Sequence, residues 1–451
     1  MRFSQLDGAA LGVWGAGREI ASLARQLGRR LPATRIAVAI FDGPPPPDAA
    51  ELLGSPGVRI AAAGEAVGAL AGCDLLVRSP GVSIHRPELR LLRERGMPVT
   101  TATALWLAER AGAGVLGVSG TKGKSTTAAL ACHLASASGL HVRLAGNIGV
   151  PALDLLDGEQ GDLDVLELSS YQIADLEIGP EVVVMTNLYR EHVDWHGSEQ
   201  AYRADKLRLL ELPGVRACVL SARDPVLGAL RPTPQLHRFA SRDGWDVQEG
   251  CVTHEGKVLL TVPELPLPGE HNALNLCAAL AGLEACGVRV VPLAQSLAGF
   301  APLPHRLQTI AVDEGVTWVD DSISTTPESA LAALASFPDG ELVLIGGGLD
   351  RGQDFTTLAA ALAERRAALV AVPSNGPRLL AAAYAAGVPP QRAVLAQDMR
   401  DAVSLARGLL PAGGVALLSP AAPSYDNYRD FEARGDRFRA DVLAGAGAPG
   451  A

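Results

Sequence analysis

Aromatic side chains and long apolar runs are both scarce in this sequence. Only 4% of the 451 residues are Phe, Trp or Tyr, so the hydrophobic cores must rely on Ala, Leu and Val. No apolar run is long enough to span a bilayer, and the first residues lack the apolar segment of a secretory signal. These absences predict a globular protein of the reducing cytoplasm, without membrane insertion.

An excess of positive charge is missing as well. The formal net charge is -10, which argues against nucleic acid or an anionic membrane as the main partner. An anionic small ligand would therefore have to be bound by local donors. The six cysteines form no C-x-x-C pair, so we expect buried free thiols instead of a disulfide framework or a zinc site.

One stretch, VLGVSGTKGKSTT at residues 115–127, has a clear chemical signature. Its first residues predict a buried strand, and the helical pattern AALACHLAS follows its glycine-rich turn. A strand, a glycine loop and a helix in this order can hold a polyphosphate, because backbone N–H groups and the helix N-terminus face the anion. Lys124 would reach the terminal phosphates and Ser125 would ligate Mg²⁺. The alternative is an ordinary glycine-rich turn.

Residues 1–105 alternate strand and helix patterns, which predicts a doubly wound sheet. The expected strands are Ala9–Trp14, Arg35–Phe41 and Asp74–Val77. Gly15 and Gly17 follow the first strand, and Asp42 follows the second. This arrangement is typical of a nucleotide site, but tight turns between strands and helices also need glycines, so both interpretations stay open.

Residues 106–302 place several candidate residues around the glycine loop. Glu167 ends a predicted strand, where a second Mg²⁺ ligand would lie, and a surface glutamate is the alternative. His192 stands near another strand end, although a solvated histidine is equally compatible with the pattern. Lys206 lies on a basic helix that could simply face solvent. Asn275 lies one turn into an Ala- and Leu-rich helix, where it could cap the helix or contact a ligand.

Residues 303–451 show a second doubly wound pattern, without a lysine-bearing phosphate loop. The expected strands are Thr309–Val312, Thr317–Val319, Glu341–Ile345, Leu369–Val372, Ala393–Leu395 and Val415–Leu418. The pattern therefore predicts an α/β protein throughout.

The order of these motifs resembles the Mur ligase family, the ATP-dependent amide ligases of peptidoglycan precursor synthesis. The stretches that carry the resemblance are GTKGKSTT, GNIGVPAL, LELSSYQ, the N-x₃-E-H-x-D pattern at Asn187–Asp194, YRADKLRL, GEHNALN, LPHR, DDS and SPAAPSYD. Within the family the chain is most similar to the members that add glutamate to UDP-N-acetylmuramoyl-L-alanine. The resemblance implies a Rossmann-like UDP-binding domain at 1–105, a P-loop ATPase domain with a mainly parallel sheet at 106–302, and a Rossmann-like domain at 303–451 that brings the amino acid.

The resemblance also implies the site residues. ATP would be contacted by Gly120, Thr121, Lys122, Gly123, Lys124, Ser125, Thr126, Asn275, Arg306 and Asp321. Two Mg²⁺ ions would be held by Ser125, Glu167, His192 and a carbamylated Lys206, with Lys124, His192 and Lys206 as the catalytic residues. The UDP-muramoyl substrate would meet Gly15, Gly17, Asp42, Gly81, Asn147 and Ser169, and glutamate would meet Arg351, Ser424, Tyr425 and Phe431.

The implied chemistry runs through an acyl phosphate. The L-alanyl carboxylate attacks the γ-phosphorus of ATP, and the amine of glutamate then displaces phosphate. Because the carboxylate and the triphosphate repel each other, Mg²⁺ and Lys124 must neutralise them. A carbamate on Lys206 would offer hard oxygens to Mg²⁺ where an ammonium would repel it.

The amino-acid end departs from the pattern of D-glutamate-adding members, which typically read D-S-K-A-T-N. This chain reads D-S-I-S-T-T from Asp321, so Ile323 replaces a lysine, and another family lysine is replaced near Arg351. An isoleucine cannot pair with a carboxylate, and Arg for Lys changes the donor geometry. The stretch resembles the variant that adds L-glutamate, with a separate epimerase acting afterwards, and D-glutamate addition is the alternative.

Two other functions stay open at this point. A folylpolyglutamate synthetase is a ligase of the same superfamily, although SPAAPSYD and the N-terminal nucleotide-type region weigh against it. A non-catalytic nucleotide switch could keep the phosphate loop, but it would not need Glu167, His192 and Lys206 together. The family's partners would be small molecules, with the chain acting as a monomer.

Overall fold

The structure is a computed structural model that describes residues 1–43, 57–189, 193–267, 269–290, 292–339, 341–410 and 413–445. The chain forms two compact units. Unit 1 comprises Met1–Thr261 and His271–Phe300, and unit 2 comprises Val262–Glu270 and Ala301–Ala451. Both units are α/β with mainly parallel sheets, which confirms the predicted fold class. The domain boundaries predicted at residues 105 and 302 stay predictions.

The first sheet of unit 1 has five parallel strands in the order β3-β2-β1-β4-β5. The strands are β1 (Ala10–Trp14), β2 (Arg35–Phe41), β3 (Arg59–Ala62), β4 (Leu75–Arg78) and β5 (Val99–Thr100). The helices around it are η1 (Phe3–Leu6), α1 (Arg18–Arg30), η2 (Ala63–Glu65), α3 (Ala66–Ala69), α4 (Pro87–Glu94) and α5 (Ala102–Arg110). Leu11 and Val13 pack with α1 and α5, whereas Trp14 packs with α3 and α4, so helices cover both faces of the sheet.

The second sheet of unit 1 has nine strands in the order β14-β13-β12-β11-β10-β9-β6-β8-β7. The strands are β6 (Val115–Ser119), β7 (Val142–Gly146), β8 (Leu163–Glu167), β9 (Val182–Met185), β10 (Ala217–Ser221), β11 (Gln235–Phe239), β12 (Trp245–Gln248), β13 (Cys251–His254) and β14 (Lys257–Thr261). The part from β7 to β11 is parallel, and β12, β13 and β14 add antiparallel hairpins. The sequence patterns did not predict these five strands from β10 to β14, and they did not predict β3, β5 or β7 either.

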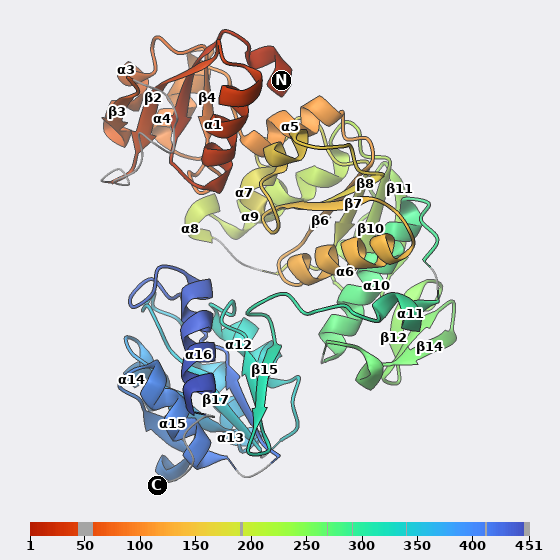
Figure 1. The fold of residues 1–451 in the computed structure, drawn as a ribbon, viewed down its shortest axis with the longest axis vertical. Coiled ribbons are helices and arrows are strands. Elements are labelled where there is room, and N and C mark those ends of the chain that lie inside the picture. The colour runs from red at the N-terminus through yellow and green to blue at the C-terminus, as the bar shows by residue number, and fades with distance from the viewer. Residues whose placement is uncertain are drawn as a thin grey trace. The chain divides into compact units, whose positions relative to one another are not determined.

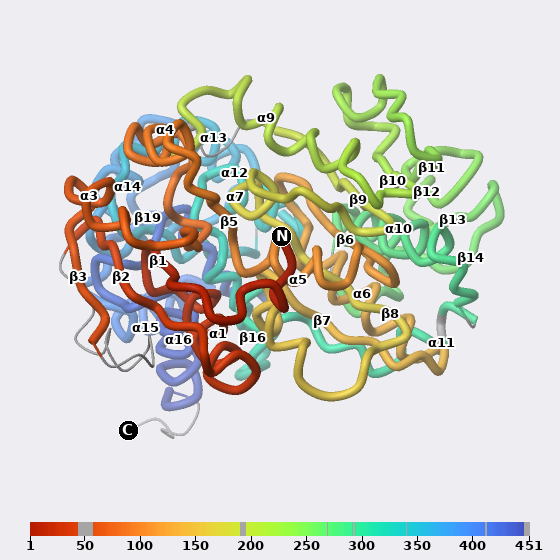
Figure 2. The backbone as a smooth tube through the Cα atoms, turned by 90° about the horizontal axis from the view of Figure 1, so that it is seen from above, coloured from red at the N-terminus to blue at the C-terminus, as the bar shows by residue number. Residues whose placement is uncertain are grey.

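The helices of this part of unit 1 lie between the strands of the second sheet and after them in the sequence. They are α6 (Lys124–Ala137), η3 (Ala152–Leu156), α7 (Ser170–Ile173), α8 (Val193–His196), α9 (Glu199–Leu207), η4 (Arg208–Glu211), η5 (Leu227–Ala229), α10 (Glu270–Ala285) and α11 (Leu293–Leu297). The short helix η6 (Val262–Glu264) follows β14 and belongs to unit 2. Helix α6 lies against β6, β7 and β8, as the ribbon shows (Figure 1) and the tube confirms from above (Figure 2). The helix that follows the glycine loop therefore covers the end of the sheet formed by β6, β8 and the edge strand β7.

The sheet of unit 2 has six strands in the order β15-β16-β20-β17-β18-β19, with only the β15–β16 pair antiparallel. The strands are β15 (Gln308–Asp313), β16 (Val316–Asp320), β17 (Leu342–Gly346), β18 (Ala368–Ala371), β19 (Ala393–Leu395) and β20 (Val415–Leu418). The helices are α12 (Pro327–Leu334), α13 (Thr356–Glu364), α14 (Gly376–Ala385), η7 (Pro390–Arg392), α15 (Met399–Leu409) and α16 (Phe431–Gly445). One sheet face packs on α12, α13 and α14, and the other packs on α15 and α16.

Two expectations from the composition concern membrane-spanning helices and the burial of the cysteines. Within the described ranges, every helix is too short or too polar to cross a lipid bilayer. All six cysteines are free thiols, but only Cys218 and Cys277 are buried. The other four are half-buried, so the expectation of buried thiols is wrong for them. Cys251 and Cys286 lie at or beside the end of an element, Cys73 lies shortly before β4 and Cys132 lies inside α6, so apolar neighbours in the sequence do not by themselves enclose these side chains.

Candidate active site

Two glycines let the phosphate loop close between β6 and α6. Gly120 and Gly123 have φ angles of 140° and 81°, a region that side chains disfavour. A Cβ at Gly120 would lie 1.9 Å from Thr186 Oγ1, and one at Gly123 would lie 2.2 Å from Asn275 Oδ1. Both positions therefore need glycine for conformation and for space, which explains the spacing of the GTKGKS motif.

The end of β9 holds the same loop from the side. The Lys122 N–H donates to Asn187 Oδ1 at 2.8 Å, and Asn187 Nδ2 donates back to the Lys122 carbonyl at 3.1 Å. Thr186 Oγ1 donates to the same carbonyl at 2.6 Å. Lys124, the first residue of α6, donates from Nζ to the Thr121 carbonyl at 2.7 Å. Hydrogen bonds from Thr186 and Asn187 thus hold the loop, and the Lys124 side chain is folded back over it.

Glu167, another predicted site residue, lies at the carboxyl end of β8. The register pairs it with Val118 near the end of β6, so it lies beside the loop. The side chain is 0% exposed; Oε1 accepts a hydrogen bond from Asn147 Nδ2 at 3.1 Å, and Oε2 has no hydrogen-bond partner among the described residues. A buried carboxylate oxygen without a donor fits a divalent cation, because hard cations prefer oxygen ligands. Ser125, near the start of α6, is also buried.

Lys206 reaches the loop from α9. It is only 2% exposed, and its Nζ donates to the Gly120 carbonyl. One turn earlier, the Tyr202 hydroxyl lies 2.8 Å from Thr121 Oγ1. Helix α9 therefore touches the phosphate loop at two points. The structure brings Lys124, Glu167 and Lys206 together at the carboxyl ends of parallel strands, where ligands of such sheets bind.

Asn275 completes this cluster from α10. Its Oδ1 accepts from Thr127 Oγ1 at 3.5 Å, and its Nδ2 donates to Asn272 Oδ1 at 3.2 Å. The structure thus places Asn275 against Gly123, at the start of α6. His192 lies outside the described residues, so its expected metal role stays a prediction.

Three polar side chains that the sequence patterns did not single out join α9 to α7. His196 Nδ1 lies 2.7 Å from Asp205 Oδ2, and His196 Nε2 lies 3.0 Å from Ser170 Oγ. Asp205 precedes Lys206, and Ser170 follows Glu167 by three residues. Asp205 and Ser170 adjoin the predicted site residues Lys206 and Ser169, whereas no predicted site residue adjoins His196.

Ser169 has a structural role beside the one expected for it. It is the N-cap of α7, where Gln172 N donates to Ser169 Oγ at 3.3 Å in a capping box. Asn147, by contrast, lies directly on Glu167 through both its side chain and its N–H, which donates to the Glu167 carbonyl at 3.0 Å. The role expected for both residues in substrate binding stays a prediction.

The residues expected around the uridine gather at the carboxyl edge of the first sheet. Gly15 has a φ angle of 89°, and a Cβ there would lie 2.9 Å from Ser79 Cβ. A Cβ at Gly17 would lie 3.1 Å from Ser79 Oγ. The two glycines therefore let the loop that contains Gly81 approach the β1–α1 turn. Asp42, which follows β2, forms a 2.7 Å ion pair with Arg86.

Asp321 is the most strongly perturbed carboxyl of unit 2. It follows β16, where it accepts hydrogen bonds from Leu307 N–H at 3.2 Å and from Ser419 Oγ at 2.8 Å. Burial raises the pKa of Asp321 to about 7, against the opposing effect of the hydrogen bonds from Ser324 and Ser419. Arg306 lies between His305 and Leu307, which both have positive φ angles.

The residues expected to hold glutamate also belong to unit 2. Ser424 is buried, Tyr425 and Arg351 are exposed, and Phe431 begins α16. Ile323 is half-buried in the turn after β16, with its N–H donating to the His305 carbonyl at 3.2 Å.

The turn that contains Ile323 is held by a buried arginine that the sequence patterns did not single out. Arg434 donates from Nε to Ser322 Oγ at 3.0 Å and from a terminal nitrogen to the Ser322 carbonyl at 2.8 Å. Burial lowers the pKa of Arg434 to about 10.

Comparison with known proteins adds an independent finding. Residues 118–283 match the Mur ligase middle domain, and residues 305–422 match the Mur ligase, glutamate ligase domain. The chain is 41% identical to the UDP-N-acetylmuramoyl-L-alanine--L-glutamate ligase of Xanthomonas euvesicatoria pv. vesicatoria, over 97% of this chain and 96% of that protein. It is 43% identical to the protein of the same name from Salinispora tropica, over 99% of this chain and 100% of that protein.

Solved structures with a similar fold are more distant in sequence. UDP-N-acetylmuramate-alanine ligase MurC of Thermotoga maritima gives a TM-score of 0.61 at 18% identity, covering 97% of this chain and 100% of that one. MurF ligase of the same organism, in complex with ADP, gives 0.59 at 16% identity, covering 99% and 97%. Mycobacterium tuberculosis folylpolyglutamate synthase, complexed with ADP, gives 0.57 at 18% identity, covering 78% and 94%. These likenesses establish the fold alone.

Proposed function

This chain belongs to the Mur ligase family, and on that premise we propose that it joins L-glutamate to UDP-N-acetylmuramoyl-L-alanine with ATP, in peptidoglycan precursor synthesis. The relatives at 41% and 43% identity are named for L-glutamate, which supports the L-form over the D-form that the sequence left open. Their full-length similarity also favours a UDP-sugar ligase over a folylpolyglutamate synthetase or a nucleotide switch. An L-glutamyl product agrees with the expected separate epimerase, and action as a monomer is part of the same proposal.

The observation that carries the proposal is the unpartnered Glu167 oxygen beside the phosphate loop. Glu167 Oε2 is buried without a donor among the described residues, next to a loop whose backbone and lysine suit a triphosphate. Ser125 and Glu167 would hold one Mg²⁺, and His192 with a carbamylated Lys206 would hold the second. The ions would supply the positive charge that lets a carboxylate approach the triphosphate.

Burial of Lys206 supports its carbamylation. Its Nζ lies against the Gly120 carbonyl and 5.4 Å from the centre of the Tyr202 ring. A carbamate forms when the lysine amine bonds to CO₂, and at this buried position beside the loop it would offer Mg²⁺ oxygen ligands. The resulting carbamate would keep the position of the side chain while changing its charge from positive to negative.

The protein side of the reaction is positioning and charge stabilisation. The loop and Lys124 hold the β- and γ-phosphates of ATP while the L-alanyl carboxylate oxygen bonds to the γ-phosphorus and ADP departs. The amine of glutamate then attacks the carbonyl carbon of the acyl phosphate. Phosphate leaves, the nitrogen loses a proton, and the amide bond is complete. The rigid contacts of Thr186 and Asn187 keep the loop in place throughout.

A phosphate-release assay tests this function directly. Purified protein is given ATP, Mg²⁺ and UDP-N-acetylmuramoyl-L-alanine with either L- or D-glutamate, and the product is identified by mass spectrometry. We expect turnover with L-glutamate and at least about tenfold less with D-glutamate. Lys124→Ala serves as the matched inactive control. Turnover with D-glutamate alone would refute the proposed acceptor, and phosphate release that ignores the UDP-sugar would refute the ligase.

A further inference from the structure

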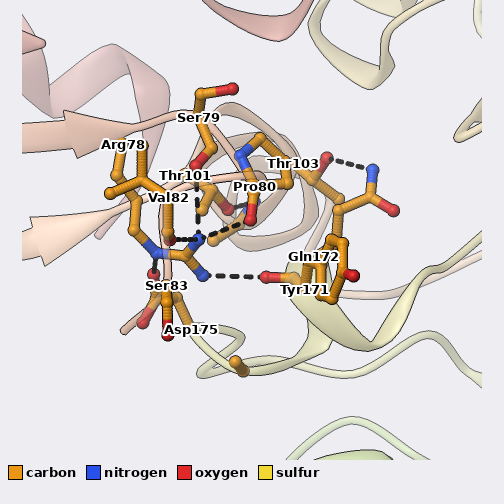
Figure 3. A network of polar contacts seen from close by, with 12 residues as sticks. Arg78, Ser79, Pro80, Val82, Ser83, Thr101, Thr103, Tyr171, Gln172 and Asp175 are labelled. Atoms are coloured by element: carbon orange, nitrogen blue, oxygen red, sulfur yellow. Dashed lines mark hydrogen bonds and ion pairs between the residues drawn. The ribbon is translucent and has the colours of Figure 1, made fainter. Parts of the chain in front are cut away.

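Arg78 occupies an unusual position at the end of β4. The side chain is 0% exposed, and Figure 3 shows its guanidinium surrounded by acceptors from two parts of unit 1. One terminal nitrogen donates to three carbonyls of the loop that follows β4: Ser79 at 3.3 Å, Pro80 at 3.1 Å and Val82 at 2.8 Å. These bonds fold the loop around the guanidinium.

The other nitrogens of Arg78 bind the region of α7. The second terminal nitrogen donates to the Tyr171 carbonyl at 2.8 Å, and Nε donates to the Asp175 carboxylate. Arg93 donates to the other oxygen of Asp175 at 2.8 Å. Because Asp175 and Tyr171 follow β8, one arginine joins the loop after β4 to the segment that follows Glu167 (Figure 3).

Trp195 closes the same loop from α8. Its Nε1 donates to the Gly81 carbonyl at 3.1 Å, and its own carbonyl accepts from Ser83 Oγ at 2.7 Å. The Arg78 guanidinium carbon lies 5.6 Å from the centre of the Trp195 ring, and Tyr171 stacks on that ring at 4.5 Å. These two hydrogen bonds of Trp195, together with those of Arg78, constrain the shape of residues 79–83.

This loop lies where a nucleotide would bind. Ser79 rests against Gly15 and Gly17 in the β1–α1 turn, at the carboxyl edge of the first sheet. A buried arginine adds little net stability compared with an apolar side chain, but its planar fork fixes acceptors in direction. The geometry points to Arg78 as a positioning residue for the UDP end of the substrate: it holds residues 79–82 in the shape that binds the nucleotide. This inference rests on the proposed function.

Arg78→Lys tests the inference, because lysine keeps the charge but cannot reach the acceptors on both sides. Binding of UDP-N-acetylmuramoyl-L-alanine alone is measured by calorimetry, and kcat and KM are measured for each substrate. We expect the Kd and KM of the UDP-sugar to rise at least about tenfold, as the loss of hydrogen bonds to a charged group predicts. The KM of ATP and kcat should change less than about twofold.

Arg93→Ala is the matched control. Arg93 binds the same Asp175 but is 38% exposed, and within the described part of the chain it makes no hydrogen bond to residues 79–83, so the KM of the UDP-sugar should stay unchanged. Trp195→Phe keeps the ring stack and loses only the donor to Gly81. It should raise the KM of the UDP-sugar by a few-fold, which keeps the test decisive if Arg78→Lys does not fold.

Two results would overturn the inference. One is equal increases in the KM of the UDP-sugar and of ATP, which a general loss of structure would give. The other is unchanged affinity for the UDP-sugar in both Arg78→Lys and Trp195→Phe. Wild-type binding of the UDP-sugar without turnover on either glutamate would refute the proposed function and leave the role of Arg78 intact.

Discussion

Lysine is rare in this chain and unevenly placed. The sequence contains four lysines, Lys122, Lys124, Lys206 and Lys257. The first two belong to the phosphate loop and the start of α6, and Lys206 reaches the Gly120 carbonyl from α9. Lys257 begins β14 and is exposed. Positive charge elsewhere is supplied by arginine, so at the residue scale lysine is concentrated where a triphosphate would bind.

Replacing Lys206 by alanine removes the amine that would carry the carbamate beside the phosphate loop. If a carbamate on Lys206 binds Mg²⁺, we expect kcat of Lys206→Ala to fall by at least about 100-fold. Acetate or formate should restore part of the activity, because a free carboxylate offers the same oxygen ligands. The measurement is steady-state phosphate release with and without each acid.

Lys257→Ala is the control for this prediction, since it removes the exposed lysine of β14. It should keep full activity and show no response to acetate. Undiminished turnover in Lys206→Ala would exclude the lysine from the site, and a loss that no carboxylate relieves would argue against the carbamate.

Helix α6 has a glycine with a positive φ angle beside each of its ends. It begins after Gly123, whose φ angle is 81°, and it is followed by Gly139, whose φ angle is 90°. The two glycines resemble each other in conformation but differ in surroundings. A Cβ at Gly123 would collide with Asn275 Oδ1 at 2.2 Å, whereas a Cβ at Gly139 would meet nothing within 4 Å.

Gly123→Ala should damage both stability and ATP binding. The positive φ angle alone costs about 1–2 kcal/mol for an alanine, and the collision with Asn275 must also displace the loop or α10. We expect a lower midpoint of urea unfolding and an ATP affinity reduced by at least about tenfold. Calorimetric titration with ATP measures the second effect.

Gly139→Ala separates the effect of a positive φ angle from the effect of the Gly123–Asn275 contact. It should lower stability by about 1–2 kcal/mol through the φ angle and leave ATP affinity within about twofold. Equal ATP affinities in the two variants would contradict the role given to the Gly123–Asn275 contact.

Three of the strands that the sequence patterns missed differ from the predicted strands in length and polarity. Strands β12, β13 and β14 are short antiparallel segments joined by Glu-Gly turns, with Glu249, Gly250, Glu255 and Gly256 all at positive φ. Two-residue turns of this kind are a hairpin signal. The signal was present, but strands of four or five residues with mixed polarity lack the continuous apolar run that revealed β6, β9 and β17.

At the scale of the whole molecule, each unit has its own hydrophobic cores. Unit 1 is built on clusters under both faces of its first sheet and the parallel part of its second, and unit 2 has a separate cluster on each face of its six-stranded sheet. Unit 2 therefore has its own stability, and buried charge within it affects that stability directly.

The stability of unit 2 should depend on pH through Asp321. Burial raises the pKa of its carboxyl to about 7 in the folded chain, whereas an unfolded aspartate has a pKa of about 3.9. Between these values the folded chain keeps a proton that the unfolded chain has released, so rising pH lowers stability until about pH 7 is passed. Asp321→Asn cannot ionise and should remove this part of the dependence, as urea unfolding at pH 5 and pH 8 would show.

Asp339→Asn provides the comparison, because Asp339 of the same unit is 71% exposed in its ion pair with Arg365. Its unfolding should follow wild-type pH dependence. An unchanged difference between pH 5 and pH 8 in Asp321→Asn would show that burial of this carboxyl does not control the stability of unit 2.

Local patterns in the sequence determined much of this protein. Apolar runs and glycine turns gave the α/β class and most parallel strands, and β2, β19 and β20 have the predicted bounds. The GTKGKS motif predicted the strand, loop and helix that β6, residues 120–123 and α6 form, because the conformation of such a unit depends on neighbours only a few residues away. The predicted site residues lie on elements that the sequence indicated: Lys124 begins α6, Glu167 ends β8 and Lys206 lies in α9.

Only the tertiary structure decided how those groups meet. Asn275 bonds to Thr127 across 148 positions of sequence, and Arg78 bonds to Asp175 across 97. No local periodicity encodes such contacts, because they depend on which strand ends share a sheet edge and which helices close over them. The burial of Glu167 with one oxygen unpartnered, of Lys206 at the loop and of Arg78 beneath residues 79–82 follows from that arrangement, since burial is a property of the assembled chain.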